Sequence, residues 1–216
     1  MARRVRILRP SFFARPTLDV ARDLLGAVLV HDTPAGRTSG LIVEVEAYIG
    51  EDDPACHAAP GRTGRNWPLY GPPGVAYVYF NYGVHWLANV VTEPEGSPAA
   101  VLLRALVPLE GIELMRERRA ARRRPSSPAV PDHALCRGPG TLTTALGIDG
   151  SCNGLTYGGD LRIEDRGLGP LPVAWSPRIG IRVGVDRPWR AYVPGERAVS
   201  GRVRDALTAA PPSAAR

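Results

Sequence analysis

Short runs of alternating apolar and polar residues dominate the first half of the chain, and a period of two is typical of β-strands. These runs lie at 27–31, 40–48, 75–82, 86–92 and 99–106, and further strand candidates follow at 161–164, 178–185 and 191–193. Gly, Pro, Asn and Asp punctuate the segments between them, as expected of turns and loops. Spacing typical of helices is confined to 17–25, 109–124 and 142–146.

The order of these elements predicts the fold class. Strands follow one another with few helices between them, which favours an α+β fold with a curved, largely antiparallel sheet and surrounding helices. We expect a single domain over 1–205, because no repeat or change of composition divides the chain. Residues 1–16 are expected to be irregular, Thr17 to cap the first helix, and 206–216, ALTAAPPSAAR, to form a disordered tail.

Composition restricts the chemistry that is available. The chain has 216 residues and a formal net charge of +6, and its 27 basic residues are all arginine. The lack of lysine excludes a lysine Schiff base or a P-loop lysine. Excess positive charge permits a polyanionic partner, although a GC-rich genome would also explain the arginines. Three widely spaced cysteines, no signal sequence and no long apolar run predict a reducing, cytoplasmic location away from membranes.

The strand at 41–48 carries two carboxylates in a suggestive position. Because side chains alternate between the faces of a strand, the apolar residues at 41, 43, 45 and 47 are expected to share one face. Glu44, Glu46 and Tyr48 are then expected to share the other. One of the two carboxylates is a candidate general base. The pattern alone favours a simpler interpretation, in which this polar face is solvated.

Two other strands carry unusual residues. Tyrosines occur on both faces of 75–82, and aromatic rings can stack on nucleobases, although strands also favour aromatics as ordinary core residues. Arg104 interrupts the apolar run at 99–106. A buried charge needs a partner, so Arg104 is expected to meet Glu44 or Glu46, unless it lies on an edge strand and reaches water.

Other charged or metal-binding patterns are weaker. The arginines between 116 and 124 alternate with acidic residues, which favours a solvated helix face over a phosphate-binding surface. Cys56–His57 and the pair His133 and Cys136 do not have the spacing of a zinc site, so no metal or cofactor is expected.

Four segments together resemble the alkyladenine (3-methyladenine, methylpurine) DNA glycosylase family, and the likeness extends over about 17–200. The segments are EVEAYIGEDDPACHA (44–58), YVYFNYGVHWLANVV (77–91), AVLLRALVPLEG (100–111) and RGPGTLTTALGI (137–148). The resemblance implies that damaged purines are flipped out of duplex DNA and excised, which begins base-excision repair. It also implies that Glu46 activates the water that attacks C1′ and that Arg104 positions this water.

The resemblance assigns the remaining site residues as well. It implies that the flipped base is bound by four side chains, Tyr48, His57, Tyr79 and Asn89, and that Tyr82 fills the gap left in the helix. Thr141 stands where the family often has lysine, and Asn81 stands where a bulky aliphatic residue is common. These departures affect DNA contacts and the range of lesions.

The leading hypothesis is therefore a monofunctional glycosylase that acts as a monomer on double-stranded DNA, associated with the nucleoid if the source is bacterial. Its expected substrates are 3-methyladenine, 7-methylguanine, ethenoadenine and hypoxanthine. Without lysine, no lyase step through a lysine imine is expected. A non-catalytic lesion-binding protein is the first alternative. A carbohydrate hydrolase that uses Glu44 and Glu46 is the second, but carboxylates two apart on one strand would not flank a glycosidic bond.

Overall fold

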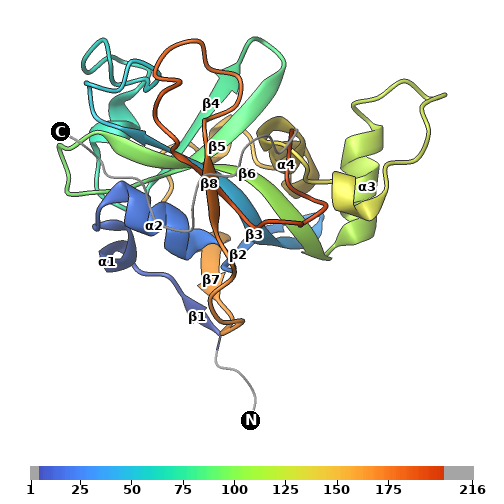
Figure 1. Cartoon of the computed structure of the whole chain (residues 1–216). Coiled ribbons are helices and arrows are strands. Elements are labelled where there is room, and N and C mark those ends of the chain that lie inside the picture. Colours follow the sequence, from blue (N-terminus) through green and yellow to red (C-terminus); the bar gives the residue numbers. More distant parts are fainter. Residues whose placement is uncertain (1–4, 202–216) are drawn as a thin grey trace.

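The computed structural model describes residues 5–201, and a single antiparallel sheet forms the body of the molecule (Figure 1). The main order of strands is β1-β7-β2-β3-β6-β5-β4, with β9 paired to β3 and β8 paired to β9. In the described range the strands are β1 (Arg6–Ile7), β2 (Val28–Thr33), β3 (Gly36–Ile49), β4 (Ala76–Asn81), β5 (His85–Val91), β6 (Ala99–Glu110), β7 (Leu161–Asp165), β8 (Ala174–Ser176) and β9 (Arg190–Tyr192). Every pairing is antiparallel, which confirms the predicted α+β class.

Four helices pack around the sheet, α1 (Pro10–Phe13), α2 (Thr17–Leu24), α3 (Ile112–Ala120) and α4 (Pro139–Leu146). Short 3-10 turns lie at Trp67–Tyr70, Asp132–Ala134 and Gly150–Cys152. Pro139 opens α4, where its missing N–H removes no hydrogen bond, and Gly147 ends the helix with φ near 70°. In Figure 1, α1 and α2 lie on one side of the view and α3 and α4 on the other.

Several details differ from the sequence-based prediction. The first sixteen residues are not wholly irregular, because β1 and α1 form there. Thr17 does not cap α2: it is the first helical residue, and its hydroxyl donates to Glu93 Oε1 at 2.6 Å. The helix predicted at 109–124 is shorter, because its first two residues extend β6 and Gly111 turns the chain with φ near 72°. The predicted tail at 206–216 lies outside the described residues.

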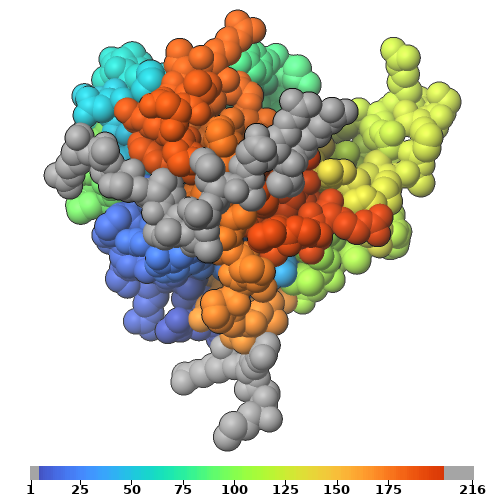
Figure 2. Space-filling view, viewed as in Figure 1, coloured from blue at the N-terminus to red at the C-terminus, as the bar shows by residue number. Residues whose placement is uncertain are grey.

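The largest correction concerns 178–185, which was predicted to be a strand. This segment forms bends and turns between β8 and β9. Gly180 and Gly184 adopt positive φ angles of 80° and 62°, which are incompatible with a continuous strand. We call residues 177–189 the covering loop. In Figure 2 this orange segment lies between the 50–74 loop and the hairpin of β4 and β5.

The long central strand β3 serves two cores. Its pairing with β6 is irregular between Ile42 and Val45. Val45 packs into the main core with the helices, whereas Val43 packs into a separate cluster with Tyr192 and Val199. The prediction that the apolar residues at 41–47 share one face is therefore wrong, because the irregular pairing changes which face the side chains present. The acidic residues of β3, Glu44 and Glu46, are also buried, outside the main hydrophobic core.

Candidate active site

Two carboxylates of β3 meet one arginine of β6. Arg104 Nη1 lies 3.0 Å from Glu46 Oε2, and Arg104 Nε donates to Glu44 Oε1 at 2.8 Å. The side chains of both glutamates have no exposed surface, and that of Arg104 is 7% exposed. The prediction that Arg104 meets a carboxylate is confirmed, and both candidates are its partners. The interpretation of this face as solvated is wrong, because the covering loop contacts Glu46 and Ser200 contacts Glu44.

Glu44 is held from several directions. Its Oε1 accepts hydrogen bonds from Arg190 Nε and Ser200 Oγ, each at 2.8 Å, and its Oε2 accepts from the Ser200 N–H at 2.6 Å. Burial alone would raise the pKa of Glu44, but the charges of Arg104 and Arg190 and the Ser200 N–H outweigh burial and lower it. Glu44 is therefore ionised at neutral pH, with its acceptor positions occupied by protein donors.

Glu46 connects the arginine to the aromatic part of the site. The Tyr48 hydroxyl donates to Glu46 Oε2 at 2.9 Å, and the Ile179 N–H of the covering loop donates to Oε1 at 2.6 Å. Burial and the charge of Glu46 raise the pKa of Tyr48, so Tyr48 keeps its proton and acts as a donor. The prediction that Glu44, Glu46 and Tyr48 share one face of the strand is confirmed, because Arg104 contacts both glutamates and Tyr48 contacts Glu46.

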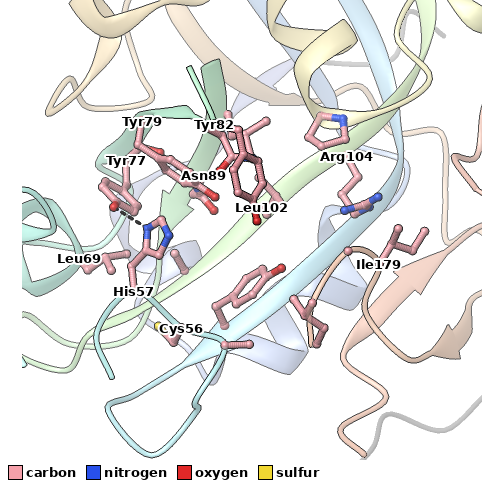
Figure 3. A pocket seen from close by; sticks show the side chains of 18 of the residues that line it. Cys56, His57, Leu69, Tyr77, Tyr79, Tyr82, Asn89, Leu102, Arg104 and Ile179 are labelled. Carbon is pink, nitrogen blue, oxygen red and sulfur yellow. Dashed lines mark hydrogen bonds between the residues drawn. The ribbon is translucent and has the colours of Figure 1, made fainter. Parts of the chain in front are cut away.

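A cavity of about 600 Å³ opens beside this carboxylate. Its lining includes Tyr48, Arg104 and Ile179, together with aromatic side chains from the 50–74 loop and β4. Figure 3 shows Tyr77, Tyr79 and His57 on one side and Arg104 and Ile179 on the other. A volume of this size and partly apolar walls are typical of a site for a small ring system.

His57 and the tyrosines of β4 form one wall of the cavity. The rings of His57 and Tyr79 lie 4.5 Å apart in an edge-to-face arrangement. His57 Nδ1 and the Tyr77 hydroxyl form a hydrogen bond of 2.8 Å. Burial, aided by the charge of Arg65, lowers the pKa of His57, and burial raises the pKa of Tyr77 to about 12. Both side chains are therefore neutral near pH 7.

Asn89 and Tyr82 complete the predicted set, at the inner and outer ends of the cavity. Asn89 is buried on β5, and its Nδ2 donates to the Tyr77 carbonyl at 2.9 Å. Tyr82 lies at the tip of the β4–β5 hairpin, where it is 89% exposed. Its φ of 48° is unusual for a residue other than glycine, and such strain is common at binding sites. Six of the seven predicted residues line one cavity, and Figure 3 labels His57, Tyr79, Tyr82, Asn89 and Arg104 among them. The seventh, Glu46, lies directly behind the lining, in contact with Arg104 and Tyr48.

A buried ion pair anchors the covering loop, and sequence inspection missed it. Arg178 donates to both oxygens of Asp53, and both side chains are fully buried. The Arg178 guanidinium also lies over the Tyr48 ring, 4.6 Å from its centroid. Arg178 precedes Ile179, so this anchor fixes the N–H that reaches Glu46. The only available signal was an arginine in an apolar run, as for Arg104.

Arg190 and Ser200 were also missed, because nothing in their local sequence distinguishes them. Within residues 5–201, no group of three or more His, Cys, Asp or Glu side chains is placed to hold a metal ion. In the same range, no helix has both the length and the apolar composition needed to cross a bilayer.

Known proteins of one family are similar to this chain. Residues 11–197 match the model of the family described as Methylpurine-DNA glycosylase (MPG). A Burkholderia lata protein is 47% identical over 201 residues, covering 91% of this chain and 92% of that protein. A Salinibacter ruber protein is 48% identical over 211 residues, covering 89% and 96%, and a Methanocella arvoryzae protein is 46% identical over 201 residues, covering 91% and 96%. Each is named "Putative 3-methyladenine DNA glycosylase".

The fold and the site thus define a DNA glycosylase, a hydrolase of N-glycosyl bonds that acts in the repair of alkylated purines. The family match covers most of the chain, and the relatives are similar over nearly their whole length. The chain belongs to the methylpurine-DNA glycosylase family, as the sequence motifs predicted.

Proposed function

We propose that this chain excises alkylated and deaminated purines from duplex DNA and leaves an intact abasic site. The proposed substrates are 3-methyladenine, 7-methylguanine, ethenoadenine and hypoxanthine. The observation that carries the proposal is the pairing of a buried carboxylate and guanidinium, Glu46 and Arg104, at 3.0 Å behind an aromatic cavity. A base bound in this cavity would place its sugar near the acidic side of the site.

The proposed chemistry is a hydrolysis. Glu46 takes a proton from a water molecule, the water oxygen bonds to C1′, and the electrons of the C1′–N bond leave with the base. A nucleotide of 3-methyladenine or 7-methylguanine carries positive charge on the base, so the base leaves neutral without a proton donor. Ethenoadenine and hypoxanthine are neutral in DNA, so each leaves as an anion and takes up a proton from solvent. Arg104 contacts Glu46 at 3.0 Å and is a donor to the incoming water. The chain has no lysine, so no lysine imine forms and the DNA strand is not cut.

Binding of the base is assigned to neutral aromatic groups. Tyr48 and Tyr79 supply ring faces, and stacking contributes about 1–3 kcal/mol per base. Neutral His57 pairs with the Tyr77 hydroxyl through Nδ1, so its Nε2 is the nitrogen available to the base. Asn89, which is buried and lines the cavity, is proposed to crowd the 2-amino group of normal guanine. A neutral wall suits cationic bases, because it adds no repulsive charge.

Tyr82 is proposed to stabilise the flipped state from outside. Extrusion of a base costs a few kcal/mol and leaves a gap in the stack. An exposed ring on a hairpin tip at the mouth of the cavity can fill this gap. The proposal also includes a single functional domain that acts as a monomer.

The alternatives are less compatible with these contacts. A protein that only binds lesions would not need two buried carboxylates and a buried arginine beside its cavity, since burying such groups is costly. A carbohydrate hydrolase needs carboxylates on opposite sides of a bond, whereas Glu44 and Glu46 contact the same guanidinium.

The test is release of free base from duplexes that each carry one of the four lesions. We expect release from at least the 3-methyladenine duplex, with strand cleavage only after alkali treatment. The Glu46→Gln variant is the inactive control. Binding of these duplexes without any release by the wild-type protein would overturn the proposal in favour of a lesion-binding protein.

A further inference from the structure

Each nitrogen of the Arg104 guanidinium has a different partner. Nη1 faces Glu46 Oε2 at 3.0 Å, and Nε donates to Glu44 Oε1 at 2.8 Å. Nη2 donates to Ser200 Oγ at 3.1 Å. A planar guanidinium held at all three nitrogens has one orientation, because rotation about any side-chain bond would break at least one contact.

The Ser200 hydroxyl has a special place among these contacts. It accepts from Arg104 Nη2 and donates to Glu44 Oε1 at 2.8 Å, so both of its hydrogen-bonding functions are used. The Ser200 backbone adds two contacts: its N–H donates to Glu44, and its carbonyl accepts from Arg190 Nη2. Ser200 is thus bonded to the partners of Arg104 as well as to Arg104 itself.

Charge balance explains why Glu44 cannot be a second general base. Its two oxygens receive four donors, from two arginines and from Ser200. Arg190 contacts Glu44 as well, so the two glutamates are paired with two guanidinium groups. Neither glutamate lines the cavity itself, but Glu46 contacts three residues that do, Tyr48, Arg104 and Ile179, whereas Glu44 contacts only Arg104 among them. Glu44 therefore acts on other side chains and not on substrate.

We propose that Glu44 and Ser200 are positioning residues that hold the Arg104 guanidinium against Glu46 in the geometry needed for water attack. This inference rests on the proposed function, because the reaction it serves is base excision. Displacement of a reacting or orienting group by about 1 Å can reduce a rate on the order of 100-fold. Loss of the positioning contacts should therefore lower the rate of the chemical step and leave DNA binding intact.

The experiment compares alanine variants of two buried serines, each of which donates a hydrogen bond to a carboxylate. Ser200→Ala removes the hydroxyl on Glu44 and Arg104, and Ser39→Ala removes a hydroxyl that donates to Glu110 at 2.7 Å, remote from the cavity. Single-turnover release of 3-methyladenine should fall on the order of 10- to 100-fold in Ser200→Ala and stay near wild type in Ser39→Ala. Affinity for a duplex with a tetrahydrofuran abasic-site analogue should be equal in all three proteins.

A second measurement, of hydrogen exchange at Arg104, does not depend on catalytic turnover. Solvent exchange of the Arg104 Nε–H, followed by NMR, should be slow in wild type and in Ser39→Ala and faster in Ser200→Ala. In an Arg104→Ala background, Ser200→Ala should cause no further loss of rate, since its effect passes through Arg104. Equal rates and equal exchange in the two serine variants would overturn the positioning role. Absence of base release by wild type would instead overturn the proposed function, and the exchange data would still decide whether Ser200 holds Arg104.

Discussion

Two clusters of ions of equal composition lie at different places on the sheet. The pocket-side cluster consists of Glu44, Glu46, Asp53, Arg104, Arg178 and Arg190. The far-end cluster consists of Asp32, Arg37, Glu110, Arg162, Glu164 and Arg166. The six residues named for each cluster are three carboxylates and three guanidinium groups, but those of the first are at most 7% exposed, whereas Arg37 in the second is 52% exposed. At the margin of the first cluster, Arg187 lies 3.7 Å from Asp53 and is 27% exposed.

The difference shows that ion pairs of the same kind serve different purposes. Solvated pairs contribute little to stability, and buried pairs must offset a large cost of desolvation. A buried cluster is therefore poor evidence of stabilisation by itself. In this chain it coincides with the wall of the cavity, where it fixes the orientation of Arg104 and anchors the covering loop. The far-end cluster fixes no residue of the cavity.

The largest expected effect comes from removing one charge of the pocket-side cluster. Glu46→Gln keeps the size of the side chain and removes the general base, so single-turnover base release should fall by about 100- to 10,000-fold. Binding of lesion-containing duplex should remain. Rapid-quench measurement of released base tests this, and a rate within threefold of wild type would contradict the role of Glu46.

Loss of Asp53 should be the most costly change for stability. Asp53→Asn leaves the fully buried Arg178 without its counter-charge, and removing one partner of such a pair costs about 3–5 kcal/mol. The free energy of unfolding in guanidinium chloride measures this cost. The covering loop should also release Glu46, so base release should slow in the fraction that remains folded. A loss below 1 kcal/mol would mean that water replaces the missing charge.

Tyr82 belongs to neither cluster, so its removal should affect binding of the flipped base without affecting the stability of the fold. Tyr82→Ala should leave the unfolding midpoint unchanged, because the ring is exposed. Affinity for lesion duplex should fall by about 1–3 kcal/mol, the value of one stacking contact. Excision from a duplex in which the lesion is already unpaired should be less affected. Equal losses on paired and unpaired substrates would refute the wedge role.

Asp32→Asn in the far-end cluster should have the smallest effect. Hydrogen bonds from Arg37 and then Arg162 lower the pKa of Asp32 to about 2. A lowered carboxylate pKa stabilises the fold above about pH 4, and this contribution disappears as pH falls towards 2. Since the pair is partly exposed, the loss at pH 7 should be below about 1 kcal/mol, and base release should not change. Unfolding curves at pH 7 and pH 3 check both points, because the difference between variants should shrink at the lower pH.

Most strands of the sheet, and the contact of Arg104 with the glutamates of β3, could be predicted from the sequence. The period of two along β3 and the cost of burying Arg104 were enough to predict that Arg104 meets Glu44 or Glu46. The motifs of the family then identified the aromatic side chains. These features could be predicted because each is carried by residue types within a short segment, either a charge in an apolar run or a family motif.

Contacts between distant segments could not be predicted in this way. Burial of Glu44 depends on Arg190 and Ser200, which are about 150 residues further along the chain. The covering loop alternates apolar and polar residues like a strand, yet its glycines at positive φ and the Arg178–Asp53 pair hold it as a loop. The local pattern shows only that this segment favours a strand, and tertiary contacts hold it as a loop.

The position of Ser200 has a consequence for synthesis on the ribosome. β3 leaves the exit tunnel early, but its acidic side chains lack their final partners until residues 190–200 have been translated. A nascent chain is therefore unable to complete this arrangement until almost all of the described residues have emerged. Truncated products that end before position 200 should lack the Ser200 contacts to Glu44 and Arg104, so we expect an unfinished polypeptide to have little base-excision activity.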